Sequence, residues 1–338
     1  MAIGVLSVGL LGVAALIPLA MHQAERGLST DRAAAAARRA YREFEVRGMA
    51  NPRLWATYQD LPPLLTDTVM VAGNPTVVPL SLCLDPIGLT SPTLARNKFP
   101  AISEAIPTPP GMPKSPTMER IKLALWPSAV IPAAKDQEVL YRELFSALDD
   151  LDFERPTNAR LPSEQQFVPN QTNPAKRLAG GRFSWMATLV PRPQLGAEMA
   201  TLSIVVMERR NNPKPDDERV FDMNLGQDFF SGGIAGGDVR LRWPAASGLN
   251  PTLVRERLEE LRSGQWIMLS QFLAGTLQSR WYRVQSVGDI DMSTKSIELT
   301  LHGPDWNPNE VTQATWIKGV VAVFEKTIRL EGSSLWTN

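Results

Sequence analysis

Few residues in this chain are suited to chemistry. It has two histidines, His22 and His302, and His302 lies three residues before Asp305. A histidine beside a carboxylate can act as a general base when a nucleophile is also within reach. The sequence around this pair has no Gly-x-Ser-x-Gly elbow and no reactive-cysteine context. We therefore interpret His302 as a polar residue at the end of a strand, and we predict no catalytic residue and no enzymatic activity.

A second candidate is an oxygen-rich segment that resembles half of a calcium loop. In it Asp222, Asn224 and Asp228 alternate around Gly226. Calcium loops close with a distant bidentate acid, and that residue is missing here. These three residues are therefore only a weak metal candidate, and we expect neither a metal nor another cofactor.

Three other polar or glycine-rich segments have a simpler interpretation. They are the acidic pair Asp149-Asp150, the basic group Arg209, Arg210 and Lys214, and the glycine-rich run Ser231–Asp238. The glycine-rich run lacks the Lys-Ser/Thr of a phosphate-binding loop, so we predict a flexible turn. We expect the acidic pair and the basic group to be solvated, the latter at a hairpin tip.

The composition narrows the class of protein further. The chain has 338 residues, 43% of them hydrophobic, with 35 basic and 35 acidic side chains. This apolar content excludes wholesale disorder, and the zero net charge gives no basic field to attract nucleic acid. Cys83 is the single cysteine, so no internal disulfide forms.

The elements that must position these residues begin with an apolar segment. Residues 1–21 carry no charge, and a helix of this length spans a hydrocarbon core of about 30 Å. We predict a transmembrane helix; a cleaved secretory signal or a buried hairpin helix are the alternatives. Residues 22–50 continue it as an amphipathic helix, with alanines on one side and arginines on the other. Together they predict a rod of about 45 residues, kinked at Pro18.

Residues 1–15, and above all the Gly-Leu-Leu-Gly pattern of Gly9–Gly12, resemble a prepilin-type N-terminus. The resemblance is to the minor pilins and pseudopilins of type IV pili and type II secretion systems. Such proteins have a basic leader, a peptidase cleavage point and an acidic residue upstream of this stretch, and this sequence lacks all three. The resemblance implies that residues 1–21 pack against other pilins in a filament. The side chains suited to that packing are Gly4, Leu6, Gly9, Leu10, Gly12 and Pro18.

Residues 51–180 form a proline-rich region that we expect to be irregular. Residues 52–132 hold 15 of the 28 prolines, which prevents long helices and central strands. Within the region we predict short strands over Thr68–Ala72 and Thr76–Leu84, and helices over residues 117–125 and 135–151.

Residues 181–338 change to a period of two and hold seven of the nine tryptophans. This pattern predicts an antiparallel β domain that contains the main core. We predict a helix over Thr252–Arg262, and strands over Arg182–Val190, Thr201–Arg209, Val239–Trp243, Gln265–Ser270, Trp281–Val287, Ser296–His302 and Ile317–Leu330.

The expected fold class is therefore α+β, with a long N-terminal helix and a mainly antiparallel β head. The resemblance implies a structural minor pilin or pseudopilin, held as a single-pass protein in the bacterial inner membrane with a periplasmic or surface-exposed head. Its expected partners are other pilins, the inner-membrane assembly platform, the lipid bilayer and, if the true start lies upstream, prepilin peptidase. The alternative is a signal-anchored extracytoplasmic enzyme or ligand-binding module.

Overall fold

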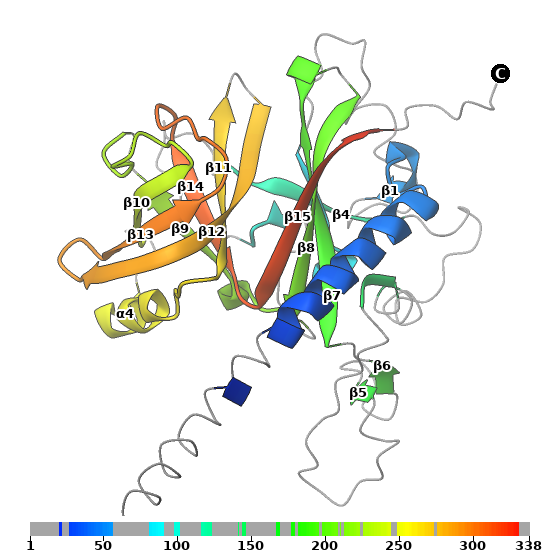
Figure 1. Ribbon diagram of the computed structural model, residues 1–338, viewed down its shortest axis with the longest axis horizontal. Coiled ribbons are helices and arrows are strands. Elements are labelled where there is room, and N and C mark those ends of the chain that lie inside the picture. Colours follow the sequence, from blue (N-terminus) through cyan, green and yellow to red (C-terminus); the bar gives the residue numbers. More distant parts are fainter. Residues whose placement is uncertain are drawn as a thin grey trace, which may run out of the picture.

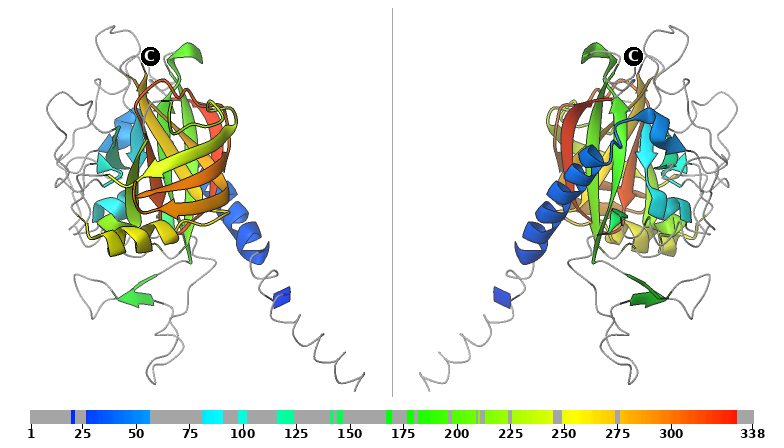
Figure 2. Two further views of the ribbon diagram at one scale, coloured as in Figure 1. Left: turned by 90° about the vertical axis from the view of Figure 1, so that its left-hand side faces the viewer. Right: turned by 90° about the vertical axis from the view of Figure 1, so that its right-hand side faces the viewer.

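The computed structural model shows three stacked layers: a helix, an open sheet and a closed barrel (Figure 1; Figure 2). It describes residues 20–21, 27–56, 81–90, 98–101, 116–123, 141, 144–146, 167–169, 177–179, 182–195, 198–208, 210, 213–223, 226–244, 249–273 and 276–330. The helix over residues 27–46 lies on one face of the sheet, and the barrel lies on the other.

The open sheet has strands from both halves of the chain. Its spatial order is β1 (Trp55–Ala56), β4 (Met118–Leu123), β2 (Leu82–Leu84), β7 (Phe183–Pro191), β8 (Met199–Glu208) and β15 (Val320–Arg329), with β3 (Lys98–Phe99) paired to β4. β2 and β4 run parallel, and the other pairs are antiparallel. A separate pair consists of β5 (Phe167–Pro169) and β6 (Arg177–Ala179).

The barrel closes six antiparallel strands on one another. Its order is β10 (Gly236–Arg242), β13 (Ser296–His302), β12 (Thr276–Asp291), β11 (Trp266–Leu273), β14 (Thr312–Ile317) and β9 (Glu218–Met223), and β9 returns to β10. The short helices are η1 (Pro52–Leu54), α2 (Pro86–Thr90), η3 (Pro193–Leu195), η4 (Pro215–Asp217) and α4 (Pro251–Glu259). α4 begins after Asn250, whose side chain accepts a hydrogen bond from the backbone amide of Thr252.

β7 and β8 lie at the centre because both of their faces are buried. Along β8, Ile204 and Val206 pack toward the helix, whereas Val205 and Met207 pack toward the barrel. The residues of β7 alternate in the same way between the two layers. A strand buried on both sides has a continuous apolar sequence rather than a polar–apolar alternation, which explains the Ser203–Met207 and Ser184–Val190 runs.

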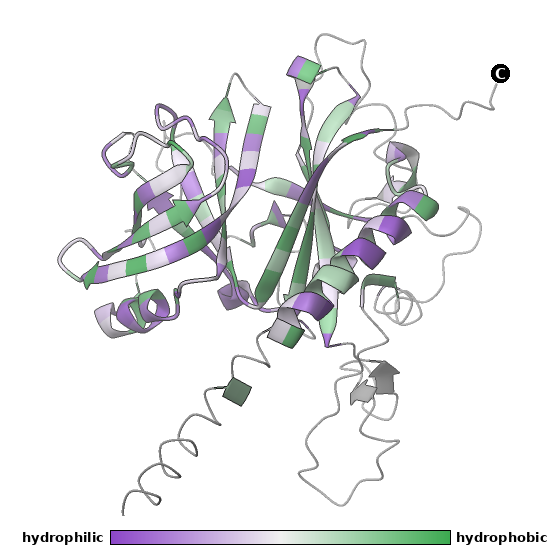
Figure 3. Cartoon of the chain, in the orientation of Figure 1, coloured by the Kyte–Doolittle hydropathy of each residue, from purple (hydrophilic) through white to green (hydrophobic). Residues whose placement is uncertain are grey.

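The helix over residues 27–46 packs on the sheet through small side chains. Ala33, Ala37, Ala40 and Phe44 recur at helical spacing and are fully buried or nearly so. The charged side of the helix faces outward, and the hydropathy colouring of Figure 3 alternates along it. Its end is a Schellman motif: the amide of Gly48, at φ +62°, donates to Glu45, and that of Met49 donates to Phe44.

The barrel interior is filled by side chains. Phe221, Leu241, Ile267 and Leu299 belong to one buried cluster inside it. Gly236 has φ +80°, and a β-carbon there would lie 2.7 Å from Cδ1 of Tyr282. Glycine at this position lets the ring of Tyr282 approach the backbone of β10 closely.

The predicted α+β fold class, with a long N-terminal helix, is wrong. The described residues are mainly β and include a closed barrel that the sequence did not predict. The continuous N-terminal helix that they contain covers residues 27–46 rather than about 45 residues. The barrel went unrecognised because alternation marks one wet and one buried face and does not distinguish an open sheet from a closed one.

The predicted single-pass placement in a bacterial inner membrane is contradicted. Among the described residues, none of the helices is both long enough and apolar enough to cross a membrane. The predicted spanning segment, residues 1–21, lies outside the described residues except for 20 and 21. The helix over residues 27–46 carries charged side chains on its outer side.

Some of the predicted helices and strands are confirmed by the structure and others are wrong. The strand over Ser296–His302 is confirmed at both ends as β13, and α4 confirms the helix predicted over Thr252–Arg262. The helix predicted over residues 117–125 is wrong, because β4 occupies Met118–Leu123. Of the predicted helix over 135–151, only residues 141 and 144–146 are described; 141, 144 and 145 are helical. The strand predicted over Thr68–Ala72 lies outside the described residues.

The packing of the helix gives a first prediction. Replacing the fully buried Ala40 by leucine inserts a large side chain between helix and sheet, and we expect it to lower the free energy of unfolding by about 1–3 kcal/mol. The matched control is Ala35→Leu on the exposed side of the same helix, which we expect to have little effect. Chemical denaturation of both variants measures the difference. Equal stabilities would show that the helix does not pack as described.

Candidate functional site

Four charged side chains meet in the layer between the sheet and the barrel. Asp85 follows β2, Arg120 lies on β4, Arg210 follows β8 and Glu218 begins β9. Their side chains are at most 5% exposed. We call this group the buried ion cluster. Its two arginines and two carboxylates sum to zero charge, so the cluster needs no external counter-ion.

Each of the two arginines in the cluster binds both acids. Arg120 donates to Asp85, and its Nη2 lies 2.7 Å from Oε2 of Glu218. Arg210 donates two hydrogen bonds to Asp85, from Nη1 to Oδ1 at 2.5 Å and from Nη2 to Oδ2 at 2.7 Å. Its Nη2 also donates to Oε1 of Glu218 at 3.2 Å. Such two-pronged arginine–carboxylate contacts are the strongest and most directional ion pairs.

Backbone groups satisfy the remaining polar atoms of the cluster. The amide of Gly88 donates to Oδ1 of Asp85 at 2.9 Å, and the amide of Ala101 donates to Oε2 of Glu218 at 2.7 Å. Arg120 donates to the carbonyl of Lys98. A β-carbon on Gly88 would lie 2.1 Å from both Arg120 Nη1 and Asp85 Oδ2. The α2 turn therefore requires glycine there.

The cluster holds Asp85, Arg120 and Arg210 in their charged forms. Burial alone would raise the pKa of Asp85, but Arg210 and Arg120 outweigh burial and keep its pKa well below the usual range. Burial would lower the pKa of Arg210, and Asp85 reverses this and raises it. The nearby thiol of Cys83 is fully buried, and burial raises its pKa well above normal. A protonated, inaccessible thiol is not a nucleophile.

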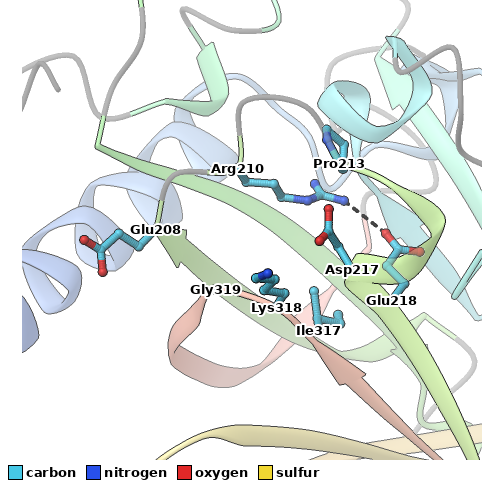
Figure 4. Close-up of a pocket in the computed structure, with 8 residues that line it drawn as sticks. All are labelled: Glu208, Arg210, Pro213, Asp217, Glu218, Ile317, Lys318 and Gly319. Carbon is cyan, nitrogen blue, oxygen red and sulfur yellow. Dashed lines mark hydrogen bonds and ion pairs between the residues drawn. The ribbon is translucent and has the colours of Figure 1, made fainter. Parts of the chain in front are cut away.

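A surface pocket of about 340 Å³ opens beside the cluster (Figure 4). Arg210 and Glu218 form part of its lining, together with Glu208, Asp217 and Lys318. Its acids have partners already: Arg182 donates to Glu208 at 2.9 Å, and the amide of Lys214 donates to Asp217 at 2.8 Å. Glu208 and Asp217 therefore each already bind another protein group, while Lys318 is exposed at the pocket.

The structure separates the roles of His302 and Asp305. His302 ends β13 and is exposed. Asp305 accepts a hydrogen bond of 2.8 Å from the amide of Ala235, which has φ +52°. Asp305 therefore holds the glycine-rich turn in place. We see no contact in the described residues that joins these two side chains into a catalytic pair.

The two acids of the weak calcium candidate that the structure describes, Asp228 and Asp222, already bind other side chains. Both carboxylate oxygens of the buried Asp228 accept hydrogen bonds from Arg242, at 2.9 and 2.7 Å. Asp222 accepts one from Gln313 at 3.1 Å, and Asn224 lies outside the described residues. Within the described part of the chain, no three His, Cys, Asp or Glu side chains gather as metal ligands.

Other predicted site residues have different outcomes. Arg210, expected at a solvated hairpin tip, lies in the buried ion cluster, whereas Lys214 is exposed as expected. Gly4, Leu6, Gly9, Leu10, Gly12 and Pro18 lie outside the described residues, as do Asp149, Asp150 and Arg209.

Sequence reasoning missed Asp85, Arg120 and Glu218. A signal was present, because Asp85 directly ends the apolar run Leu82–Leu84 and Arg120 interrupts the alternation of β4. A charge within a buried strand requires a partner of opposite sign. Apart from Arg210 and Glu218, which are 8 residues apart, the partners are 35 to 125 residues apart, and no local pattern reveals such distant pairs.

We compared the chain with models of protein families, with curated proteins and with solved structures, and it matches none of them. The interpretation of the site therefore depends on its geometry alone.

The cluster predicts a specific pH dependence of stability. Because the pKa of Asp85 is lower in the folded protein than the unfolded value of about 3.9, its stabilising effect is present above that pH and is lost on further acidification. Asp85→Asn leaves two buried arginines facing one acid. We expect it to cost about 3–5 kcal/mol of unfolding free energy at pH 7 and to flatten the loss of stability below pH 4.

The control for this variant is Asp216→Asn. Asp216 forms a similar two-pronged pair with Arg257 but its side chain is 69% exposed, so we expect a change of about 0–1 kcal/mol. Urea unfolding from pH 3 to pH 8 compares the two. Equal losses at pH 7 would contradict a special role for the buried cluster.

Proposed function

We propose that this chain is a structural assembly subunit, of the minor pilin or pseudopilin kind, and not an enzyme. The observation that carries the proposal is the fixed helix over residues 27–46. Its alanine side is buried on the sheet, and the apolar segment of residues 1–21 precedes it in the sequence. In an assembly subunit, a helix held firmly on the head gives the segment that contacts other subunits a defined place of attachment.

The head supports the proposal by its rigidity. One continuous apolar layer joins the sheet to the barrel, and it includes Met186, Val205, Met268 and Trp281. The buried ion cluster spans the same layer. Two β bodies joined by a packed apolar layer and by oriented ion pairs move as one unit, which suits a load-bearing part.

The site geometry argues against the enzyme alternative. Catalytic groups need access to substrate and a pKa suited to proton transfer. The perturbed groups of the buried ion cluster are inaccessible and fully paired, and the acids of the adjacent pocket bind protein groups. The resemblance of residues 1–15 to prepilin-type sequences adds independent support for an assembly role.

The proposal predicts that small residues near the N-terminus are needed for assembly. We expect Gly9→Leu/Gly12→Leu to abolish incorporation, because leucine at these two positions prevents the apolar segments of neighbouring subunits from approaching closely. The tagged full chain is expressed in a bacterium with type IV pilus machinery, and the sheared filament fraction is immunoblotted. Val5→Leu/Val8→Leu is the matched control, since it keeps all three glycines. Equal incorporation of the glycine variant, or absence of the wild type from the filaments, would contradict the proposal.

The proposal also predicts that the purified chain has no hydrolase activity. We expect turnover of generic ester, peptide, glycoside and phosphate substrates to equal the buffer background, with wild type and His302→Ala indistinguishable. Turnover that survives repurification and disappears in His302→Ala would instead establish the enzyme alternative.

A further inference from the structure

The outer side of the helix over residues 27–46 presents a regular basic stripe. Leu28, Arg32, Ala35, Arg39, Arg42 and Val46 follow one another at spacings of three and four, and all are exposed. The stripe is opposite the buried alanine side, because residues at this spacing share one helix face. Between Arg32 and Arg42 the helix has four arginines and no acid. At its two ends Leu28 and Val46 are 57% and 85% exposed.

The far side of the barrel presents a surface of opposite character. The turn before β10 exposes Phe230 and Ile234, at 51% and 71%. The exposed carboxylates of Asp238 and Asp305 lie at the same turn, because the amide of Phe230 donates to the Asp238 carbonyl and Asp305 binds the amide of Ala235. Segments 226–238 and 302–311, which meet there, contain no lysine or arginine. The neighbouring Arg240 lies over the ring of Phe230, 5.0 Å from its centroid, and its charge is balanced by an ion pair with Glu298.

This acidic apolar turn is built to hold its shape. Gly232, Gly233, Gly236, Gly237 and Ala235 all have positive φ values. The turn is tied to the segment after β13 by three hydrogen bonds: Trp306 to Gly233, Gly303 to Ala235, and Ala235 to Asp305. A strained backbone that holds two large apolar side chains in water is typical of a binding surface. The predicted flexible turn is thus a braced one.

The two surfaces face away from each other. In the barrel ring β10 lies three strands from β11, and β11 and β12 contribute the residues that pack on the sheet. The helix covers the opposite face of that sheet. Figure 1 shows the helix and β10 on opposite sides of the molecule. One chain therefore cannot bring its own stripe and turn together.

We propose that the acidic apolar turn of one copy binds the basic stripe of a second copy, head to tail. This inference rests on the proposed assembly function and names the partner as the same chain. Carboxylates face arginines, while Phe230 and Ile234 cover apolar residues of the stripe. A contact between two different surfaces leaves one of each free at the ends, so it extends into an open chain or a ring instead of stopping at a dimer.

The test measures the mass of the full chain in non-ionic detergent by sedimentation velocity. All samples carry Gly9→Leu/Gly12→Leu, so contacts through residues 1–21 do not contribute. We expect concentration-dependent association that weakens at least tenfold between 50 mM and 500 mM salt. Ile234→Lys on the turn and Arg39→Glu/Arg42→Glu on the stripe should each weaken it by a further factor of ten or more.

Mixing the two weakened variants is the decisive step. Each retains one intact surface, so the mixture should form a dimer with one copy of each variant and nothing larger. Leu195→Ser and Arg255→Glu/Arg262→Glu are the matched controls, because they alter exposed residues outside the stripe and the turn; both should associate like the parent protein. Monomers at every concentration, association that persists in both variants, or no dimer on mixing would overturn the head-to-tail contact. The filament test of the glycines is independent of these outcomes.

Discussion

The arrangement of the head depends on the need to neutralise charge between two β layers. Asp85 and Arg120 belong to the sheet side, whereas Glu218 begins the barrel, and Arg210 links the two. Removing a charge from water costs several kcal/mol unless partners replace the solvent. Glu218 reaches its partners Arg120 and Arg210 only when the sheet and the barrel dock in one orientation. The cluster therefore favours one specific orientation of the barrel on the sheet. Apolar packing alone would restrict that orientation less.

The apolar layer around the cluster supplies stability, and the cluster adds orientation. Met186, Val205, Met207 and Met268 lie in that layer, and methionine adapts to irregular gaps without dictating one geometry. Arginine guanidinium groups bound at two edges tolerate little displacement. The combination explains how strands β7 and β8 can be buried on both faces and still have a defined register with their neighbours.

An element of this fold could be predicted when the residues that determine it are close together in the sequence, and not when they are far apart. β13 was predicted at both ends because Ile297, Leu299 and Leu301 alternate with polar residues within one strand. β4 was predicted as a helix because its apolar residues also fit a helical period, and its strand state depends on pairing with β2 and β1. β9 was missed for a related reason: Glu218 and Arg219 look exposed in the sequence, yet both are buried with partners far along the chain.

The chemistry of the buried charges bears on the class of function. An active site keeps at least one perturbed group in reach of a substrate, because proton transfer or nucleophilic attack requires contact. Within the buried ion cluster, the perturbed groups Asp85 and Arg210 bind each other through two hydrogen bonds, and Cys83 is kept protonated within the same layer. None of these three groups is in reach of a substrate. Among the described residues, the exposed charged groups include those of the helix stripe and the braced turn, the two surfaces on which the proposed assembly contact depends.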